Sequence, residues 1–267
     1  MKIAVLADTT CMRTRDIITY FKTINREIDC VIIEKNYRKK FSASEKIYRT
    51  THDKYNRKTK KYSLLRRTVR HIWDIAPISL KKQIIINISK IPFLRKFSIS
   101  NFCNKYNIKT FEVEKHSSKK TEEIFNEREI QYVLMVSSNW LLKEPIISMP
   151  HTKIINAHSG WLPKHKGLDS IPWSILNGDP IGLTTHFIDS GIDSGNILKF
   201  YQVQIDDGDS YNMLNKKIGE LQPLAFADTL TRLANDEIIP KPQDDKYKPH
   251  KPMSYEELCE AVKSLSN

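Results

Sequence analysis

Residues 2–34 read KIAVLADTTCMRTRDIITYFKTINREIDCVIIE. The apolar run 2–7 has a β-branched centre and ends at a polar turn, which predicts a buried strand. The run 29–34 predicts a second strand. Between the two, apolar residues recur at helical spacing: Ile17, Ile18, Phe21 and Ile24. A strand, a helix and a strand in this order are typical of a parallel sheet with helices on its faces, so we predict an α/β fold.

The same alternation of strands and helices resumes after residue 108. The predicted strands are 109–113, 131–136, 153–155, 182–188 and 196–205, and the predicted helices are 121–130, 171–176, 211–233 and 254–265. A domain boundary is expected near residue 200, which divides a sheet-containing unit, 1–200, from a small C-terminal region, 201–267.

The turn after the first strand, Asp8–Arg13, contains no glycine. A dinucleotide fingerprint would need G-x-G-x-x-G at this position, so a nicotinamide-dependent dehydrogenase is disfavoured. The four cysteines form no C-x-x-C pair, which predicts reduced thiols and no metal site. Neither a membrane-spanning apolar run nor a signal peptide is apparent, and a cytoplasmic location is expected.

Residues 38–100 differ from the rest of the chain in charge. They contain 18 Lys and Arg against 3 Asp and Glu, whereas the remainder contains 25 against 28. We interpret this segment as a basic helical insertion in the α/β unit. The favoured interpretation is a flap with one apolar and one solvated side. The alternative is a surface for an anionic partner, namely a membrane, a nucleic acid or a phosphorylated substrate.

The stretch from Asn156 to Gly195 concentrates polar, titratable and glycine residues. Asn156 and His158 lie two apart after an apolar run, so on an extended chain both side chains point to one face. Histidine moves protons near neutral pH, a carboxamide N–H can stabilise an oxyanion, and Asp193 could hold and charge the imidazole. These three groups suit acyl transfer without a covalent enzyme intermediate, since no G-x-S-x-G nucleophile elbow is present.

Structural interpretations of the same residues stay open on spacing alone. Asn-x-His pairs are common and mostly structural, and His165 and His186 are expected to be a loop residue and a strand residue rather than ligands. Residues 137–141 follow a predicted strand, where open α/β sheets bind ligands. A ligand loop and a plain strand-to-helix turn explain these residues equally well.

A resemblance to a known family separates these alternatives. N-x-H-x-x-x-L-P-x-x-x-G begins at Asn156, G-D-x-x-G-x-T-x-H-x-I-D begins at Gly178, and D-x-G-x-I begins at Asp193. In this order the motifs resemble the folate-dependent formyltransferases. One departure is visible, because Ser159-Gly160-Trp161 follows the histidine where many members have Pro-Ser or Gly-Ser.

The resemblance implies a Rossmann-like, mostly parallel sheet with helices on both faces, and it makes 1–200 the catalytic domain. It also implies transfer of a formyl group from 10-formyl-tetrahydrofolate to a primary amine. Asn156, His158 and Asp193 fall on the family's catalytic residues. Two loops fall where the family holds the pterin, largely through backbone groups: Ser138, Asn139, Trp140 and Leu141, and Ile188, Asp189, Ser190 and Gly191.

The family uses three main amine acceptors. Glycinamide ribonucleotide enzymes carry a glycine-rich phosphate loop after the first strand, which this chain lacks, and initiator methionyl-tRNA enzymes carry a sizeable further C-terminal domain. We therefore expect a nucleotide-linked amino sugar destined for surface glycans. The alternatives are methionyl-tRNA, another small amine, or a non-catalytic module that binds an anionic surface. A homodimer and a peripheral membrane contact through residues 38–100 are further expectations, and nucleic acid is not an expected partner.

Overall fold

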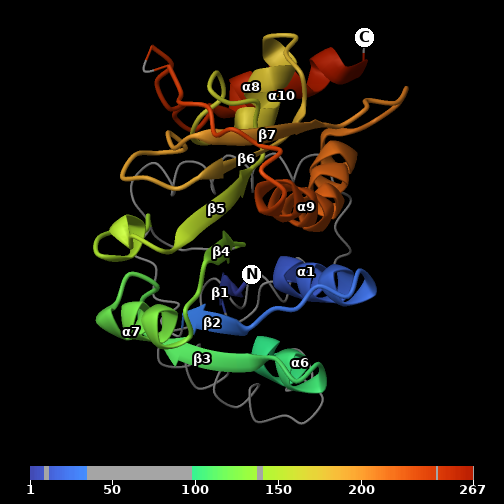
Figure 1. Ribbon diagram of the computed structural model, residues 1–267. Coiled ribbons are helices and arrows are strands. Elements are labelled where there is room, and N and C mark those ends of the chain that lie inside the picture. The colour runs from blue at the N-terminus through green and yellow to red at the C-terminus, as the bar shows by residue number, and fades with distance from the viewer. Residues whose placement is uncertain (9–11, 35–97, 137–140, 245, 267) are drawn as a thin grey trace, which may run out of the picture.

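The computed structural model describes residues 1–8, 12–34, 98–136, 141–244 and 246–266 (Figure 1). Their centre is a seven-stranded sheet of order β3-β2-β1-β4-β5-β6-β7. The strands are β1 (Ile3–Asp8), β2 (Cys30–Glu34), β3 (Lys109–Val113), β4 (Tyr132–Met135), β5 (Lys153–His158), β6 (Gly182–Phe187) and β7 (Ile197–Gln202). The first five strands are parallel, and β6 and β7 are antiparallel to their neighbours. The predicted mostly parallel α/β sheet is confirmed.

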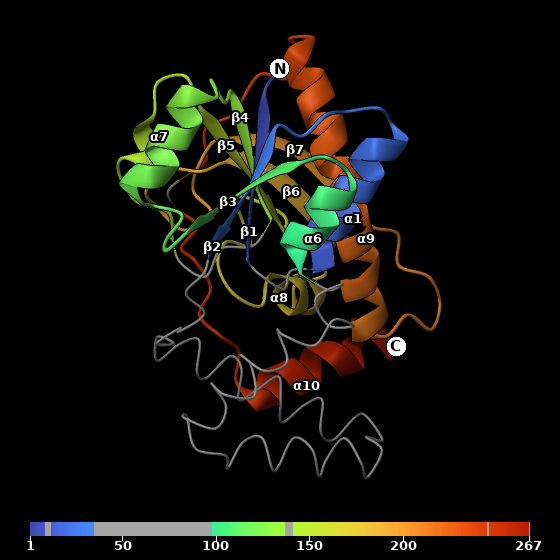
Figure 2. The ribbon, with the colours of Figure 1, turned by 90° about the horizontal axis from the view of Figure 1, so that it is seen from below.

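Helices cover both faces of this sheet (Figure 2). The helices are α1 (Met12–Thr23), α6 (Ile99–Lys105), α7 (Lys119–Glu127), α8 (Ser170–Leu176), α9 (Tyr211–Ala234) and α10 (Tyr255–Lys263), with short 3-10 turns η1 (Ile146–Ser148) and η2 (Ser264–Ser266). One face packs on α1, α6 and α9, and the other packs on α7 and η1. The predicted basic insertion falls almost wholly on residues 35–97, which lie outside the described part.

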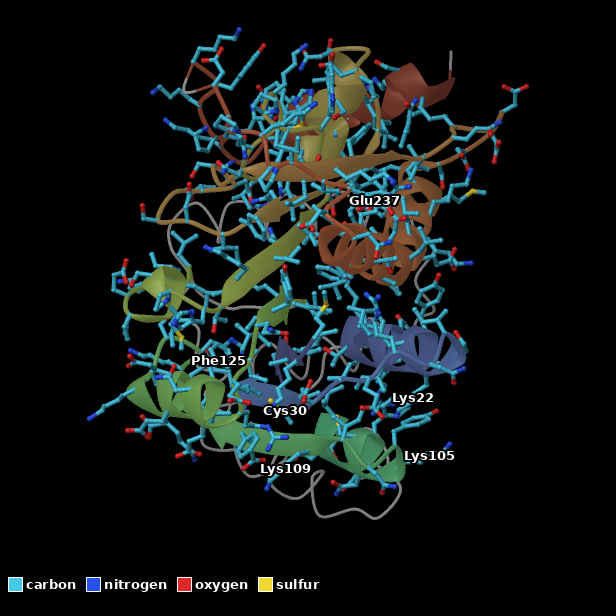
Figure 3. All side chains as sticks on the ribbon, in the orientation of Figure 1. Lys22, Cys30, Lys105, Lys109, Phe125 and Glu237 are labelled. Carbon is cyan, nitrogen blue, oxygen red and sulfur yellow. The ribbon has the colours of Figure 1, made fainter. Side chains whose placement is uncertain are left out.

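Alternate side chains of β1 point to opposite faces of the sheet, and both faces are buried. Ile3, Val5 and Ala7 belong to the core cluster under α1 and α9, whereas Ala4 and Leu6 belong to the cluster under α7. Phe125 of α7 and Cys30 of β2 lie on this second side of the sheet (Figure 3). A strand buried on both faces reads as a continuous apolar run, as parallel strands do.

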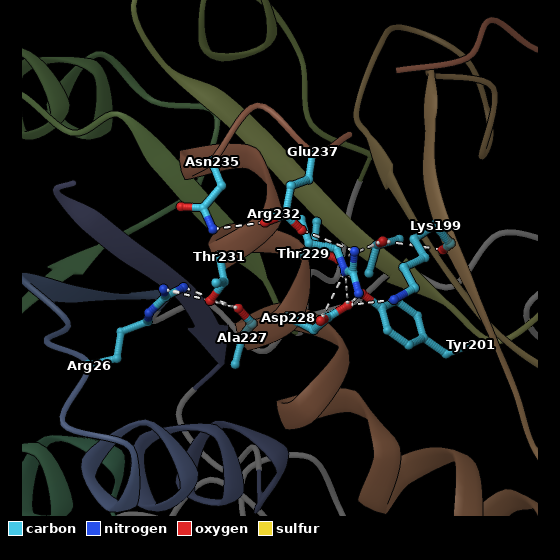
Figure 4. Close-up of polar contacts among 11 residues, drawn as sticks. Arg26, Lys199, Tyr201, Ala227, Asp228, Thr229, Thr231, Arg232, Asn235 and Glu237 are labelled. Atoms are coloured by element: carbon cyan, nitrogen blue, oxygen red, sulfur yellow. Dashed lines mark hydrogen bonds and ion pairs between the residues drawn. The ribbon is translucent and has the colours of Figure 1, made fainter. Parts of the chain in front are cut away.

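Helix α9 is fastened to the rest of the fold by polar contacts as well as by its apolar face (Figure 4). The Arg26 guanidinium donates to the Ala227 carbonyl at 3.2 Å and to the Thr231 hydroxyl at 2.9 Å. Asp228 accepts from Lys199 Nζ and from the Tyr201 hydroxyl, each at 2.8 Å. The domain boundary at residue 200 stays a prediction, and α9 shares one core cluster with β1 and α1.

Truncating the core of α9 should therefore destabilise the sheet-containing unit as well. Phe226 is fully buried, and Phe226→Ala is expected to lower the free energy of unfolding by about 3–5 kcal/mol through lost burial and a cavity. Leu224 on the same helix is 42% exposed, so Leu224→Ala should stay within about 0.5 kcal/mol of the unchanged chain. Urea unfolding followed by circular dichroism measures both, and equal effects would contradict this packing.

Several polar side chains gather where β1 and β2 end. Asp8 and Glu34 pair in register at the carboxyl ends of the two strands, and both are buried. The His116 ring lies 3.2 Å from the carbonyls of Ala7 and Ile32, and its backbone N–H donates to Glu34 at 3.1 Å. Burial lowers the pKa of His116, and the nearby carboxylates oppose this only in part.

None of the described helices is long and apolar enough to cross a bilayer.

Candidate active site

Strands β5 and β6 place the first catalytic candidates. The sequence predicted a strand that stops at Ile155, but β5 continues to His158 because antiparallel β6 pairs with its last residues. The register sets Asn156 opposite His186 and His158 opposite Thr184. Side chains two apart and directly opposite one another share a face of the sheet, so Asn156, His158 and His186 point to the same side.

Asp193 completes the group from the loop between β6 and β7, where its backbone is left-handed with φ 49°. Its Oδ2 atom lies 3.3 Å from His158 Nδ1 and accepts a hydrogen bond from the Gly167 N–H at 3.0 Å. Its Oδ1 atom lies 3.5 Å from Asn156 Nδ2 and 3.6 Å from His186 Nε2. The structure thus brings the three predicted catalytic residues together across 37 positions of sequence.

The surroundings of Asp193 favour its charged form. Burial alone raises the pKa of a carboxyl group, but the charge of His158, the hydrogen bond and charge of His186 and the Gly167 N–H outweigh burial. Together they hold the pKa of Asp193 well below its usual range. Asp193 is therefore a carboxylate at neutral pH and a weak proton acceptor.

The two histidines are surrounded by polar partners on both ring nitrogens. His158 Nε2 lies 2.7 Å from the His165 carbonyl while Nδ1 faces Asp193, so both ring nitrogens face acceptors. A protonated ring can donate to both, whereas a neutral ring can donate to only one of them. His186 Nδ1 lies 2.7 Å from the Phe187 carbonyl and donates to it, whereas Nε2 lies 3.2 Å from Asn156 Nδ2 and 3.6 Å from Asp193 Oδ1.

A second polar cluster lies behind His158. The fully buried His165 ring contacts Asp179 through Nε2 at 2.8 Å and His250 through Nδ1 at 3.1 Å. His250 also stacks on Trp173, with ring centroids 4.8 Å apart. Burial lowers the pKa of His165 more than Asp179 raises it, so this ring is neutral at neutral pH. The cluster fixes the loop whose His165 carbonyl accepts a hydrogen bond from His158 Nε2.

Gly195 keeps the Asp193 loop against β6. A Cβ atom at this position would lie 2.0 Å from the Phe187 carbonyl oxygen, a backbone atom that cannot move aside. Gly195→Ala is therefore expected to lower the free energy of unfolding by about 1–3 kcal/mol. Gly219→Ala, in an open position of α9, should instead raise it by about 0.5–1 kcal/mol, because glycine weakens a helix interior. Thermal unfolding compares the two variants, and equal midpoints would contradict this contact.

The predicted cofactor-binding residues fall into two groups. Ser138, Asn139 and Trp140 lie outside the described residues, whereas Leu141 is described and 59% exposed. The neighbouring Leu142 belongs to an apolar cluster against which Ile188 of the second loop packs.

Within the second loop, the Asp189 carboxylate accepts from the Gly191 N–H at 3.0 Å and from the Ser194 hydroxyl at 2.6 Å. These bonds shape a turn whose residues Asp189, Ser190 and Gly191 are at the surface. Binding of a cofactor by the two loops stays a prediction.

Several residues of the site were not predicted from the sequence. His186 and His165 were expected to be strand and loop residues, which they are, but both also contact the catalytic candidates or their supports. Gln243 and His250 reach the site from the C-terminal region. No local pattern marks them, because their role depends on pairing between distant segments. Within the described residues, no group of three or more His, Cys, Asp or Glu side chains is arranged to hold a metal ion.

Comparison with known proteins places this arrangement in a family. A family model described as formyl transferase matches residues 77–230, more than half of the chain. The methionyl-tRNA formyltransferase of Caldanaerobacter subterraneus subsp. tengcongensis is 30% identical over 129 residues, which are 48% of this chain and 42% of that protein. The chain thus matches less than half the length of this curated relative.

Solved structures share the fold. A phosphoribosylglycinamide formyltransferase from Anaplasma phagocytophilum superposes with a TM-score of 0.57 at 16% identity, covering 94% of this chain and 99% of that one. A sugar N-formyltransferase from Shewanella sp. FDAARGOS_354 gives 0.54 at 15% identity, covering 94% and 76%. At these identities the likeness concerns the fold, and the family model decides membership: the chain belongs to the formyl transferase family.

Proposed function

We propose that the chain is an N-formyltransferase that moves the formyl group of 10-formyl-tetrahydrofolate to the primary amine of a nucleotide-linked amino sugar. The convergence of Asn156, His158 and Asp193 carries the proposal. It provides a carboxamide donor and an imidazole ring, each within hydrogen-bond or ion-pair reach of one carboxylate. These groups can stabilise an oxyanion and accompany a proton, and they offer no side-chain nucleophile that would form an acyl-enzyme.

The described residues fit a reduced folate. Leu141 of the first predicted cofactor loop and Ile192, next to the second, expose apolar side chains, 59% and 43% respectively. Exposed apolar side chains suit a flat ring, and the backbone of residues 188–191 offers hydrogen-bonding groups to its edge. When bound, 10-formyl-tetrahydrofolate supplies the formyl carbon on a nitrogen that can leave.

Each residue has a distinct part in the transfer. Asn156 Nδ2 lies 3.2 Å from His186 Nε2, while its contact with Asp193 at 3.5 Å is at the limit of a hydrogen bond. This weaker N–H is available to an oxyanion. The imidazolium of His158 adds a positive charge beside it.

Asp193 acts mainly through its charge. Because its pKa is low, it is a weak proton acceptor, and its part is to stabilise positive charge on the His158 ring. It also orients a water that carries the proton lost by the attacking amine to the departing folate nitrogen. One C–N bond forms, one breaks, and the proton ends on the leaving nitrogen.

The distribution of charged residues supports an amino sugar linked to a nucleotide as the acceptor. Asp8 and Glu34 place two carboxylates at the ends of β1 and β2, and like charge opposes a phosphate bound there. That position is where glycinamide ribonucleotide enzymes carry their phosphate loop. Residues 38–100, with 18 Lys and Arg against 3 Asp and Glu, provide the positive charge that a nucleotide diphosphate requires.

Methionyl-tRNA is the second candidate acceptor. The observation that favours it is the 30% identity to a methionyl-tRNA formyltransferase over 48% of this chain. The same basic segment would suit the tRNA backbone. The two candidates share the chemistry of the site and differ only in the molecule that presents the amine.

A panel of acceptors distinguishes these candidates. The purified chain is incubated with 10-formyl-tetrahydrofolate and, in separate arms, with nucleotide-linked amino sugars, glycinamide ribonucleotide and methionyl-tRNA. Mass spectrometry measures the gain of one formyl group. We expect the gain in an amino-sugar arm. A gain only with methionyl-tRNA would replace the proposed acceptor, and no gain in any arm would remove the proposed activity.

A further inference from the structure

The C-terminal segment that follows α9 crosses both loops of the active site. We call its residues 241–244 and 246–253 the C-terminal strap. Lys241 and Ile197 exchange two backbone hydrogen bonds of 2.8 and 2.9 Å at one end of the strap. At the other end, the Met253 N–H donates to the Asp169 carboxylate at 2.9 Å. The strap therefore joins the loop that bears Asp193 to the loop that follows His158.

Gln243 is the strap residue closest to the catalytic candidates. Its Nε2 atom donates to the Asp193 carbonyl at 2.8 Å and to the Gly195 carbonyl at 2.6 Å. Backbone carbonyls only accept, so these two bonds identify the nitrogen end of the amide. The Oε1 atom of Gln243 is buried without a hydrogen-bond partner among the described residues. Leaving such an oxygen unpartnered costs stability, so the contribution of this side chain lies in the two bonds that its nitrogen donates.

The two hydrogen bonds from Gln243 Nε2 hold an unfavourable backbone conformation at Asp193. Asp193 has φ 49°, a left-handed backbone that non-glycine residues avoid. The bonds from Gln243 to the carbonyls of Asp193 and Gly195 fix the chain on either side of Ser194. With the backbone fixed, the carboxylate points to His158 Nδ1 and the Gly167 N–H.

The second half of the strap fixes the opposite loop. The His250 N–H donates to the Lys166 carbonyl at 2.8 Å, and its own carbonyl accepts from the Leu168 N–H at 3.2 Å. Between those residues lies Gly167, whose N–H donates to Asp193. A Cβ atom on Gly167 would lie 2.7 Å from the His250 carbonyl oxygen, so strap and loop are in direct contact.

We propose that Gln243 is a positioning residue for Asp193 and that the C-terminal strap sets the distance between Asp193 and His158. The proposal rests on the formyl-transfer function proposed above, for which Asp193 must face His158. Both hydrogen bonds of Gln243 are made to backbone carbonyls of the Asp193 loop. Gln243 acts through the backbone on which Asp193 is mounted.

Two substitutions remove the nitrogen donors while keeping the size of the side chain. Gln243→Met leaves the carbonyls of Asp193 and Gly195 without this donor. Gln243→Glu places a carboxylate, which can only accept, opposite the same two carbonyls. Either change lets Asp193 relax, and a displacement of about 1 Å in an active site costs up to about 100-fold in rate. We expect kcat to fall about 10- to 100-fold while KM for the amine changes little, because the substrate-binding groups are untouched. Gln202→Glu, on the exposed end of β7, is the matched control and should leave kcat unchanged.

Two further measurements separate positioning from a general loss of structure. The acidic limb of the pH profile should move to higher pH in the Gln243 variants, because Asp193 loses the contacts that hold its pKa low. Amide hydrogen exchange of Gly167 should become faster, since its acceptor is the Asp193 carboxylate, while exchange in α7 stays unchanged.

The exchange measurement needs no substrate, so it decides whether Gln243 holds Asp193 even if the acceptor panel shows no formyl transfer. Faster exchange at Gly167 together with a lower kcat supports the proposal. Unchanged Gly167 exchange overturns it, whatever happens to the rate. Faster exchange with an unchanged kcat also overturns it, because the position of Asp193 would then not matter for the reaction.

Discussion

His158→Ala is expected to lower the rate of formyl transfer by about 10³-fold while the fold remains intact. The substitution removes the positive charge beside the developing oxyanion. It also leaves Asp193 without the partner at 3.3 Å that contributes most to its ionisation. Asn156→Ala removes the carboxamide donor and is expected to cost about 10²- to 10³-fold. Product is measured by mass gain in the amino-sugar arm.

The control for these variants is a histidine outside the site. His151 is exposed in the turn before β5, and His151→Ala should retain the full rate. Circular dichroism and urea midpoints establish that each variant is folded, and His158 lies at a strand end where truncation leaves the backbone pairing with β6 intact. Full activity of purified and folded His158→Ala or Asn156→Ala would remove the catalytic assignment, whichever amine is the acceptor.

Much of the fold follows from local patterns. Runs such as 2–7 and 29–34 are apolar throughout because helices cover both faces of the sheet, so burial is visible in the sequence itself. The end of β5 was less visible. Polar residues at Asn156 and His158 look like a loop, but β6 supplies hydrogen bonds that extend the strand through them.

The active site was predictable only in part. A family motif contains Asn156, His158 and Asp193, and it predicted them as catalytic residues. Their spacing in the sequence was also compatible with purely structural roles. His186 required the register of β5 with β6, and Gln243 required the path of the strap after α9. Contacts between segments this far apart leave no periodicity, so only the folded chain shows them.

The negative charge of Asp193 is expected to contribute to the reaction rate. Asp193→Asn keeps the volume and the possibility of hydrogen bonds but removes the negative charge that lies 3.3 Å from His158 Nδ1. We expect the transfer rate to fall by about 10²- to 10³-fold. Asp207→Asn, the same change on an exposed turn, should leave the rate unaffected. Equal rates for the two variants would show that the charge of Asp193 has no part in the reaction.

The same substitution should show a dependence of stability on pH whose sign is fixed by the direction of the pKa shift. The folded-state pKa of Asp193 lies below the value of about 3.9 expected in the unfolded chain. Its ionisation therefore stabilises the fold fully above that unfolded value, and the stabilisation is lost as the pH falls through the folded pKa. At pH 7 we expect Asp193→Asn to be less stable than the unchanged chain by about 2 kcal/mol. At pH 3 the gap should narrow by roughly 1 kcal/mol, because much of the unfolded chain is then protonated at this residue. Urea unfolding of both chains at the two pH values measures the gap, and a gap independent of pH would mean that the pKa of Asp193 is the same in the folded and unfolded chains.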